Sequence, residues 1–210
     1  MAQRVPQLFE RLIAVHEALE RGGFEHAIGG AIALSTHIRD PRTTRDIDLN
    51  IIANPARPEP LLACLPSEIQ IHGGVRNELM RDGQTRLIWP DPRTPVDIFL
   101  PQHPVFHHSV AARAQPIDFF GTPIKVLAAT DLMVFKMLFN RGKDWVDIIE
   151  IVRAGTADTD EAKGWIAELL GEDDSRIATL NEIIETTEVI GFEDLGAMPE
   201  PVFRWPTPPA

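Results

Sequence analysis

The sequence is poor in cysteine, in tyrosine and in long apolar stretches. Its 210 residues include a single cysteine, Cys64, which excludes an internal disulfide framework and a zinc site built from thiolates. A membrane-spanning helix needs a run of about 18 apolar residues, and the sequence has none. The first residues carry Glu10 among apolar side chains and so lack the apolar segment of a secretory signal. We therefore expect a cytoplasmic protein with no membrane partner.

Positive charge is also scarce. The formal net charge is −11, which argues against a broad nucleic-acid-binding surface, because phosphate neutralisation needs a local excess of Lys and Arg. Residues 1–100 contain 11 Lys and Arg against 13 Asp and Glu, whereas residues 101–210 contain 9 against 18. If a polyanion binds, the first half is therefore where we expect it to bind.

The hydrophobic pattern predicts an α+β protein. Strand candidates follow one another instead of alternating with helices, which favours a mixed sheet flanked by helices over a doubly wound sheet. We expect this core to span residues 1–120, a helical region 121–190, and a Pro-rich extended tail 191–210. Thr130 is the expected N-cap of the first helix in the second region. The expected helices cover residues 7–21, 31–38, 61–65, 126–141, 143–155, 159–170 and 174–189, and the expected strands cover 24–28, 46–52, 69–72, 85–89 and 96–100.

Two aspartates flank Ile47 in the expected strand DIDLNII. Residues i and i+2 of a strand point to the same face, so Asp46 and Asp48 project to one side. Two carboxylates so close raise each other's pKa unless a cation lies between them. Magnesium suits such a pair, since it takes oxygen ligands from one or two carboxylates and from substrate phosphates. The alternative is a pair of solvated acids on an edge strand.

A third aspartate lies in the otherwise apolar segment VDIFL. Asp97 cannot share a face with Val96 and Ile98, and a carboxylate on the covered side of a sheet is costly unless it is paired or binds a metal. If this strand lies beside the first one, three carboxylates meet on one face, as a two-metal phosphoryl-transfer site requires. The alternative is an acid on the exposed face of a half-buried strand.

Two glycines precede the aspartate pair at a turn from a strand to a helix. Gly29 and Gly30 lie in AIGGAIALS, where glycine allows the backbone to approach a ligand closely and the helix start offers free N–H groups to phosphate. The segment lacks both the G-x-G-x-x-G and the GK[ST] signatures. Its significance comes from its position just before Asp46.

The segments AIGGAIALSTHIRDPRTTRDIDLNI and TPVDIFL together resemble the minimal nucleotidyltransferases of the DNA polymerase β-type superfamily. The first segment is especially similar to bacterial abortive-infection toxins of the AbiEii-like (type IV) group and to related uncharacterised proteins. The resemblance implies a nucleotidyltransferase core at residues 1–120. It also implies transfer of a nucleoside monophosphate from a nucleoside triphosphate. It further implies a role as the toxin of a toxin–antitoxin or phage-defence system, with a cognate antitoxin as partner.

The resemblance also implies roles for individual residues. Gly29 and Gly30 would hold the triphosphate, and Asp46 and Asp48 would bind Mg²⁺ or Mn²⁺. Asp97 would share a metal ion and accept the proton of the attacking hydroxyl. Pyrophosphate would leave in line with the attack, so catalysis would consist mainly of positioning and charge neutralisation.

Three basic residues are expected to contact the nucleotide. Arg42 and Arg45 flank the aspartate pair, and guanidinium groups suit a triphosphate, although either one can instead pair with the aspartates. Lys136 interrupts an apolar helical run and is within reach of a phosphate if the helix faces the site. The alternative for Lys136 is a surface lysine whose stem covers apolar neighbours.

The segment RGKDWVD resembles a motif that follows the core in the related toxins. Asp144 and Asp147 lie at i and i+3, on one face of the expected helix. They either contribute to the site or interact favourably with the positive end of the helix dipole. The family often has tyrosine in this motif, where this chain has Trp145, so the function of the segment is left open.

The histidines are not expected to act in the chemistry. His37, at the end of the small-residue helix, is interpreted as structural. His103, His107 and His108 lack the regular spacing of helical metal ligands, and we expect them to be solvated in a loop.

Two other classes of function compete with nucleotidyl transfer. A metal-dependent glycosyltransferase uses a D-x-D pair but needs neither Gly-Gly nor a third aspartate, and a non-catalytic binding module needs no acidic triad. The acceptor stays open between RNA such as tRNA, a protein and a cationic small molecule of the aminoglycoside type, which the acidic second half suits. The residues that would line an RNA path are Arg39, Arg42, Arg76, Arg81, Arg86 and Arg93.

Overall fold

The computed structural model describes residues 5–188. The expected Pro-rich tail, 191–210, lies outside the described residues. Among the described helices, none is long and apolar enough to cross a membrane. The strands are β1 His26–Ile28, β2 Ile47–Ile51, β3 Gln84–Trp89, β4 Thr94–Phe99, β5 Gln115–Phe119 and β6 Thr122–Val126. The helices are α1 Gln7–Arg21, α2 Gly30–Leu34, α3 Glu59–Cys64, α4 Val75–Asp82, α5 Pro104–Arg113, α6 Ala129–Phe139, α7 Gly142–Ala154, α8 Thr159–Leu170 and α9 Ser175–Thr186.

The six strands form one mixed sheet in the order β3-β4-β2-β1-β6-β5. β2 is parallel to β4 and β1 is parallel to β6, while the other neighbours are antiparallel. The helices α6 to α9 follow the sheet in the chain. The α+β class expected from the sequence, a mixed sheet flanked by helices and followed by a helical region, is therefore confirmed.

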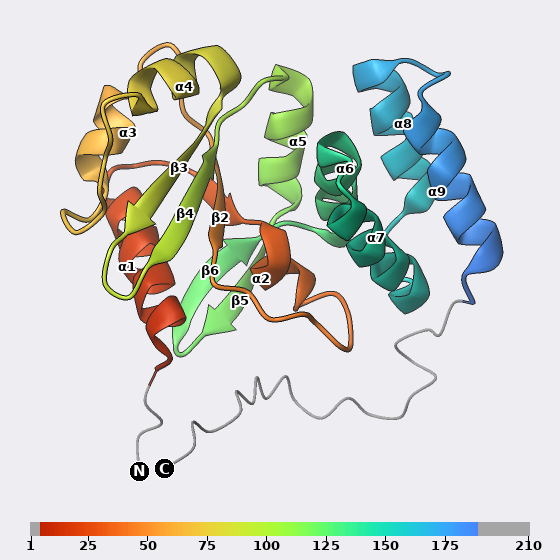
Figure 1. The fold of residues 1–210 in the computed structure, drawn as a ribbon, viewed down its shortest axis with the longest axis horizontal. Helices are drawn as coiled ribbons and strands as arrows, with labels where there is room; N and C mark the ends of the chain where they lie inside the picture. Colours follow the sequence, from red (N-terminus) through yellow and green to blue (C-terminus); the bar gives the residue numbers. More distant parts are fainter. Residues whose placement is uncertain (1–4, 189–210) are drawn as a thin grey trace.

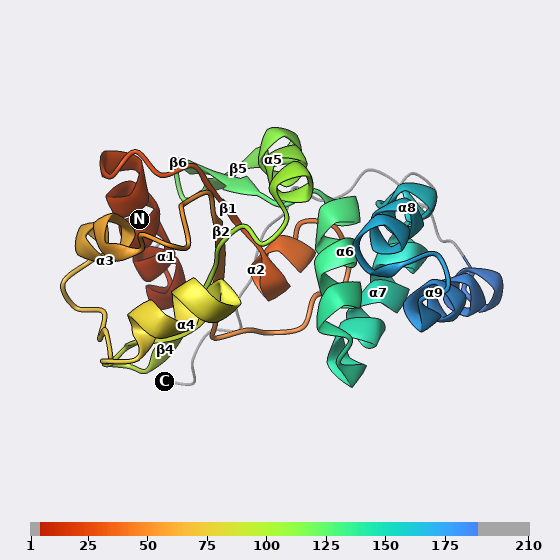
Figure 2. The same ribbon diagram turned by 90° about the horizontal axis from the view of Figure 1, so that it is seen from above.

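The helices lie in two groups around the sheet. Figures 1 and 2 both show α1 and α3 at one end of the molecule and α6 to α9 at the other, with α2 and α5 next to α6. The apolar stripe of α1 is fully buried at Leu12, Val15 and Leu19, as the helical spacing of these residues predicts. The core continues without interruption from α1 through the sheet into α6 and α7.

Several elements differ from the sequence-based expectation. Residues 69–72 form no strand, and only Gln70 makes an isolated bridge, to Ile88. The helices α4 and α5 and the hairpin of β5 and β6 were not expected, and the sheet therefore continues past residue 120 to Val126. The helix after Gly29 ends early, at Leu34.

The expected cap of α6 is also wrong. The helix is preceded by Ala128, and no side chain caps it. Thr130 lies inside the first turn, where its hydroxyl accepts a hydrogen bond from the backbone N–H of Asp158 at 2.9 Å. The hydroxyl thus connects α6 to the start of α8 instead of capping its own helix.

A buried ion pair joins three of the helices. Asp131 on α6 is fully buried and accepts hydrogen bonds from the guanidinium of Arg113 on α5, one of them at 3.1 Å from Nε. Arg113 also pairs with Glu161 on α8 at 3.2 Å. Burial raises the pKa of Asp131 even beside this partner, because an isolated charge in the core is strongly disfavoured.

We expect Arg113→Met to lower the free energy of unfolding by about 3 kcal/mol, because it leaves the carboxylate of Asp131 buried without its partner. Urea unfolding at pH 7.5 measures this loss. Arg153→Met is the matched control, since Arg153 forms an exposed ion pair with Glu150 on one helix, and its removal should change stability by less than about 0.5 kcal/mol. Adding Asp131→Leu to Arg113→Met should restore most of the loss. A double variant as unstable as the single one would show that the buried charge is not the cause.

Candidate active site

The parallel pairing of β2 and β4 brings two of the predicted aspartates side by side. Asp48 lies directly opposite Asp97 in the register of the two strands. Ile47, Leu49 and Ile51 are buried on one face of β2, and Asp48 lies on the other. The alternation read from the sequence therefore places both carboxylates at one cavity, together with Asp46 just before β2.

The glycine turn packs against Asp48. The backbone N–H of Gly29 donates to the carbonyl of Asp48 at 2.9 Å. Gly30 has φ of 58°, a left-handed value that glycine adopts without strain. A Cβ on Gly30 would lie 1.9 Å from Oδ2 of Asp48, so any larger residue collides with the carboxylate. Gly30 is thus required by Asp48, whereas a Cβ on Gly29 would meet the side chains of Asn50 at 2.8 Å and Leu127 at 3.2 Å.

Arg86 holds the other two aspartates. It lies opposite Asp97 in the antiparallel register of β3 and β4 and donates to both oxygens of that carboxylate, at 2.7 and 2.6 Å. Its Nη2 is also 3.6 Å from Asp46. These carboxylates raise the pKa of Arg86. From the sequence, Arg86 is expected only among the residues that line an RNA path, whereas pairing residues 85–89 and 96–100 as a hairpin sets it against Asp97.

Asp48 has no such partner. Within the described part of the chain its carboxylate forms no hydrogen bond or ion pair. Burial, together with the neighbouring Asp97 and Asp46, raises its pKa from 3.8 to about 6. An unbalanced carboxylate beside two others is the environment in which a bound cation stabilises the ionised form.

The three carboxylates do not form a compact set by themselves. Within residues 5–188, no choice of one carboxylate oxygen from each of Asp46, Asp48 and Asp97 brings the three oxygens within 4.8 Å of one another. Arg86 contacts both Asp46 and Asp97. Two of the predicted ligands are thus bridged by a side chain cation, and the third is free.

Basic side chains surround the carboxylates in one cavity. The helical region supplies Lys136, Arg141 and Lys143, and the core supplies Arg42 and Arg86. The remaining lining residues are Gly30, Ala31, Thr44, Asp46, Asp48, Asn50, Asp97, Phe99, Leu127, Leu132, Phe135, Phe139 and Asp144. A cavity with acidic and basic groups together is suited to a polyphosphate with its metal ions.

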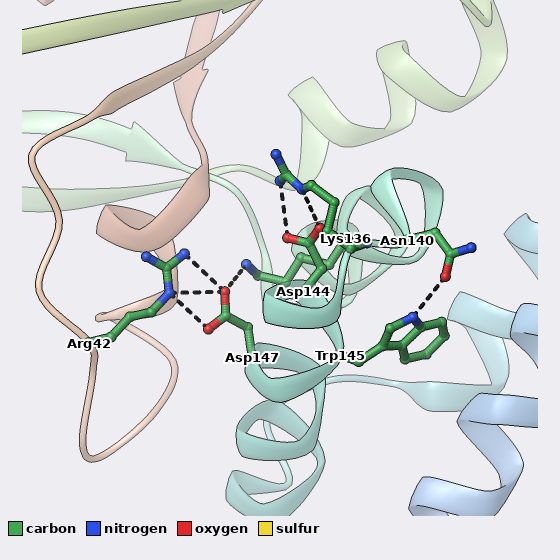
Figure 3. A network of polar contacts seen from close by, with 7 residues as sticks. Arg42, Lys136, Asn140, Asp144, Trp145 and Asp147 are labelled. Atoms are coloured by element: carbon green, nitrogen blue, oxygen red, sulfur yellow. Dashed lines mark hydrogen bonds and ion pairs between the residues drawn. The ribbon is translucent and has the colours of Figure 1, made fainter.

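Two of the predicted nucleotide contacts bind Asp147 instead. Arg42 donates to both carboxylate oxygens of Asp147, at 3.0 Å from Nε and 3.1 Å from Nη2, and Lys136 Nζ donates to Oδ2 at 2.6 Å. Figure 3 shows both cations directed at this carboxylate. Burial raises the pKa of Asp147, but the two cations outweigh it and the pKa is lowered.

The alternative of a surface position for Lys136 is wrong, since its side chain is buried. Burial lowers the pKa of Lys136, and the ion pair with Asp147 opposes this effect. Lys136 lines the cavity, and its amino group already donates to Asp147.

Asp144 stabilises the start of α7. Its carboxylate accepts from the backbone N–H of Arg141 at 3.1 Å and from the Arg141 guanidinium at 2.6 Å, so it satisfies the N–H that precedes the helix and pairs with the same residue. This position matches the alternative in which Asp144 interacts favourably with the positive end of the helix dipole.

Two further contacts hold the side chains around the start of α7. Arg141 stacks on the ring of Phe139, 4.8 Å from its centroid. Trp145 donates a hydrogen bond to Asn140 at 2.8 Å.

Arg45 and the histidines lie outside the cavity. Arg45 is exposed and is not part of the lining. His37 Nε2 is 2.7 Å from the carbonyl oxygen of Leu127, as expected of a structural histidine. The loop expected around His107 is wrong, because α5 begins at Pro104. His103 precedes this helix and accepts from the N–H of Phe106, whereas the ring of His107 contacts the His103 carbonyl.

Comparison with known proteins gives only distant likenesses. No family profile matches the chain, and no curated protein matches it. Among solved structures, an antigenic nucleotidyltransferase-like protein from Paracoccidioides brasiliensis is 17% identical with a TM-score of 0.49, over 88% of this chain and 96% of that chain. The antibiotic-resistance factor ANT(2'')-Ia is 14% identical with a TM-score of 0.41, over 84% and 90%. Likenesses this low identify neither the activity nor the substrate of this chain, and neither protein is described as an abortive-infection toxin.

We expect Asp48→Asn to raise the free energy of unfolding at pH 8 by about 1 to 3 kcal/mol when no divalent cation is added. The folded pKa of about 6 exceeds the ordinary value of 3.8, so the ionised carboxylate costs stability above pH 6, and this cost fades as the pH falls towards 4. The gain should therefore vanish near pH 4, as measured by urea unfolding at pH 4, 6 and 8. Asp118→Asn, at an exposed strand position, should show no gain. An equal gain at pH 4 and pH 8 would contradict the electrostatic cause.

We expect Gly30→Ala to lower the free energy of unfolding by about 2 to 4 kcal/mol, because the Cβ adds a collision with Asp48 to the strain of a left-handed residue. Gly121→Ala is the control for strain alone, since Gly121 has φ of 89° and open space around its Cβ. It should cost about 1 kcal/mol. Thermal and urea unfolding measure both variants. Equal losses would show that contact with Asp48 is unimportant.

Proposed function

We propose that the protein is a nucleotidyltransferase that transfers a nucleoside monophosphate from a nucleoside triphosphate to an acceptor hydroxyl or phosphate. The observation that carries this proposal is the register of β2 and β4, which sets Asp48 against Asp97 at a cavity lined by Asp46, the glycine turn and five basic side chains. Carboxylates for metal ions and cations for phosphates are the two components that phosphoryl transfer requires.

The donor chemistry of the three aspartates suits a divalent metal ion, and their oxygens, which lie farther apart in this structure than ligands of one ion, would have to move closer to bind it. All three offer oxygen, the donor that Mg²⁺ and Mn²⁺ prefer, and Asp48 has an unpaired carboxylate with a raised pKa. When bound by Asp46, Asp48 and Asp97, the metal would neutralise charge on the triphosphate. Arg86, which pairs with Asp97 in this structure, would be available to a phosphate if that carboxylate held the metal ion.

The residues of the chain then have separate tasks in the transfer. Gly30 keeps the wall beside Asp48 open, since it has no side chain there. Arg86, Arg141 and Lys143 bind the phosphates and balance their charge. Asp97 accepts the proton of the attacking hydroxyl. The acceptor oxygen forms its bond to the α-phosphorus as the bond to the bridging oxygen of pyrophosphate breaks, and pyrophosphate leaves with that electron pair.

The acceptor is proposed on the basis of charge. Residues 101–210 hold twice as many acidic as basic residues, although the charged side chains that this half contributes to the cavity itself are mainly basic: Lys136, Arg141 and Lys143 beside Asp144. The overall charge of this half, not the charge of the cavity wall, favours a cationic small molecule, such as an aminoglycoside, over RNA. The expected tRNA acceptor, the toxin role and a cognate antitoxin are supported only by the resemblance of residues 27–52 to the toxin family.

A specific contact supports a second candidate function. Arg86 binds Asp97 through two hydrogen bonds and also contacts Asp46, as a structural ion pair would. A chain in which this pairing is permanent would bind a nucleotide without catalysing its transfer. Titration with nucleoside triphosphates in the presence of Mg²⁺, combined with the transfer assay below, separates the two functions.

We expect transfer of label to one acceptor class when the protein is incubated with Mg²⁺ or Mn²⁺, each α-labelled nucleoside triphosphate, and pools of aminoglycosides, tRNA and protein. Asp48→Asn and Asp97→Asn should each reduce the transfer by about 100-fold or more, because each removes charge that stabilises the transition state. The matched control Asp118→Asn, with its aspartate on exposed β5, should keep wild-type activity.

Binding of a triphosphate without transfer to any pool would favour the non-catalytic module. Full transfer by Asp97→Asn would exclude the proposed role of Asp97. If no triphosphate binds at millimolar concentration, the proposed function is wrong in both forms.

A further inference from the structure

A second group of ligand atoms lies where α1 meets β1, away from the aspartates. His16 and Glu20 are one helical turn apart on α1, and His26 is the first residue of β1. One ligand atom of each residue lies within 4.8 Å of the other two. Within residues 5–188, this is the only group of at least three His, Cys, Asp or Glu side chains that meets this condition.

His26 is held as a metal-binding histidine usually is. Its Nδ1 lies 2.8 Å from the carbonyl oxygen of Phe24, so Nδ1 carries the proton and donates it. A histidine that binds a metal through one ring nitrogen commonly donates from the other to a carbonyl or carboxylate, which fixes the ring. The Nε2 of His26 is therefore free of its proton and faces His16 at 2.8 Å.

His16 and Glu20 lie on the side of His26 that is open to solvent. Burial and the neighbouring His26 lower the pKa of His16, which favours the uncharged ring that binds metals. The exposed Glu20 carboxylate is 3.9 Å from Nδ1 of His26, the nitrogen that donates to Phe24. To reach a metal ion on Nε2 of His26, Glu20 must turn from the solvent side towards the gap between the two rings.

The distances allow an ion between the rings with a small adjustment. Ligand atoms on a tetrahedral zinc ion, at about 2.0 to 2.1 Å from the metal, lie about 3.3 Å apart. The two ring nitrogens are at 2.8 Å, so they need to separate by about half an ångström. The proton of His16 moves from Nδ1 to Nε2 in the same change, and no net proton is released.

We propose that His16, Glu20 and His26 form a binding site for zinc(II), with water completing the coordination. Two imidazoles and one carboxylate suit zinc, whereas magnesium prefers oxygen ligands only. A bound ion would connect the last turns of α1 to β1 across the turn at Gly22 and Gly23. Because β1 leads directly into Gly29, zinc would fix the far end of the strand that carries the glycine turn.

The test is equilibrium dialysis of the full-length protein, without a histidine tag, against zinc chloride in excess Mg²⁺. We expect one zinc ion per chain in the wild type and a higher melting temperature when zinc is present. His16→Ala should weaken zinc binding by about 100-fold or more and Glu20→Gln by about 10-fold or more. Loss of a residue that only hydrogen-bonds to a ligand already lowers metal affinity by about 10- to 100-fold, and loss of a ligand should cost at least as much. Both residues lie at least partly on the surface, so these variants should fold, and circular dichroism checks this.

Two control variants separate this site from the others. His108→Ala removes an exposed histidine on α5, and Asp48→Asn removes the unpaired carboxylate of the active-site cavity. Both should bind zinc as the wild type does. Equal zinc affinity in the wild type and in His16→Ala, loss of zinc in Asp48→Asn alone, or no zinc bound by the wild type would each overturn the proposal.

Discussion

The repulsion between two carboxylates on neighbouring parallel strands is the constraint on which the rest of the site depends. Asp48 and Asp97 are in register, and like charges so close destabilise each other more strongly as water is excluded. The fold compensates them unequally. Asp97 receives the guanidinium of Arg86, while Asp48 receives no partner and its pKa rises to about 6. This imbalance favours the binding of a cation beside Asp48.

The parts of the site that depend on local geometry could be predicted from the sequence. Strand alternation placed Asp46 and Asp48 on one side, and the apolar neighbours of Asp97 marked its carboxylate as unusual. The pairing of cations with anions could not be predicted in the same way. Arg42 and Lys136 were expected at the nucleotide, but both bind Asp147. Arg42 and Asp147 are far apart in the sequence, so only the folded packing of the segment before β2 against α7 determines this choice.

The missed elements are those whose sequences carry weak or conflicting signals. β5 and β6 each contain a proline, at Pro116 and Pro123, which argues against a strand unless the strand lies at an edge or the proline near its start. The helix α5 mixes histidines with small residues and has no clear apolar stripe, so its period is hidden. Thr130 resembled a cap by residue type, but α6 begins one residue earlier and uses the hydroxyl for a contact with α8. Tertiary packing decided these three cases.

The shared carboxylate of Asp147 has a consequence for how the chain can change over time. Arg42 comes from the segment that leads to Asp46, whereas Lys136 comes from α6. Because one acceptor serves both donors, the effects of substitutions at the three positions will not add. Substitutions in the segment before Asp46 and in the helices that follow the sheet are therefore constrained together. A segment exchanged with a distant homologue would need to bring its own counter-ion along.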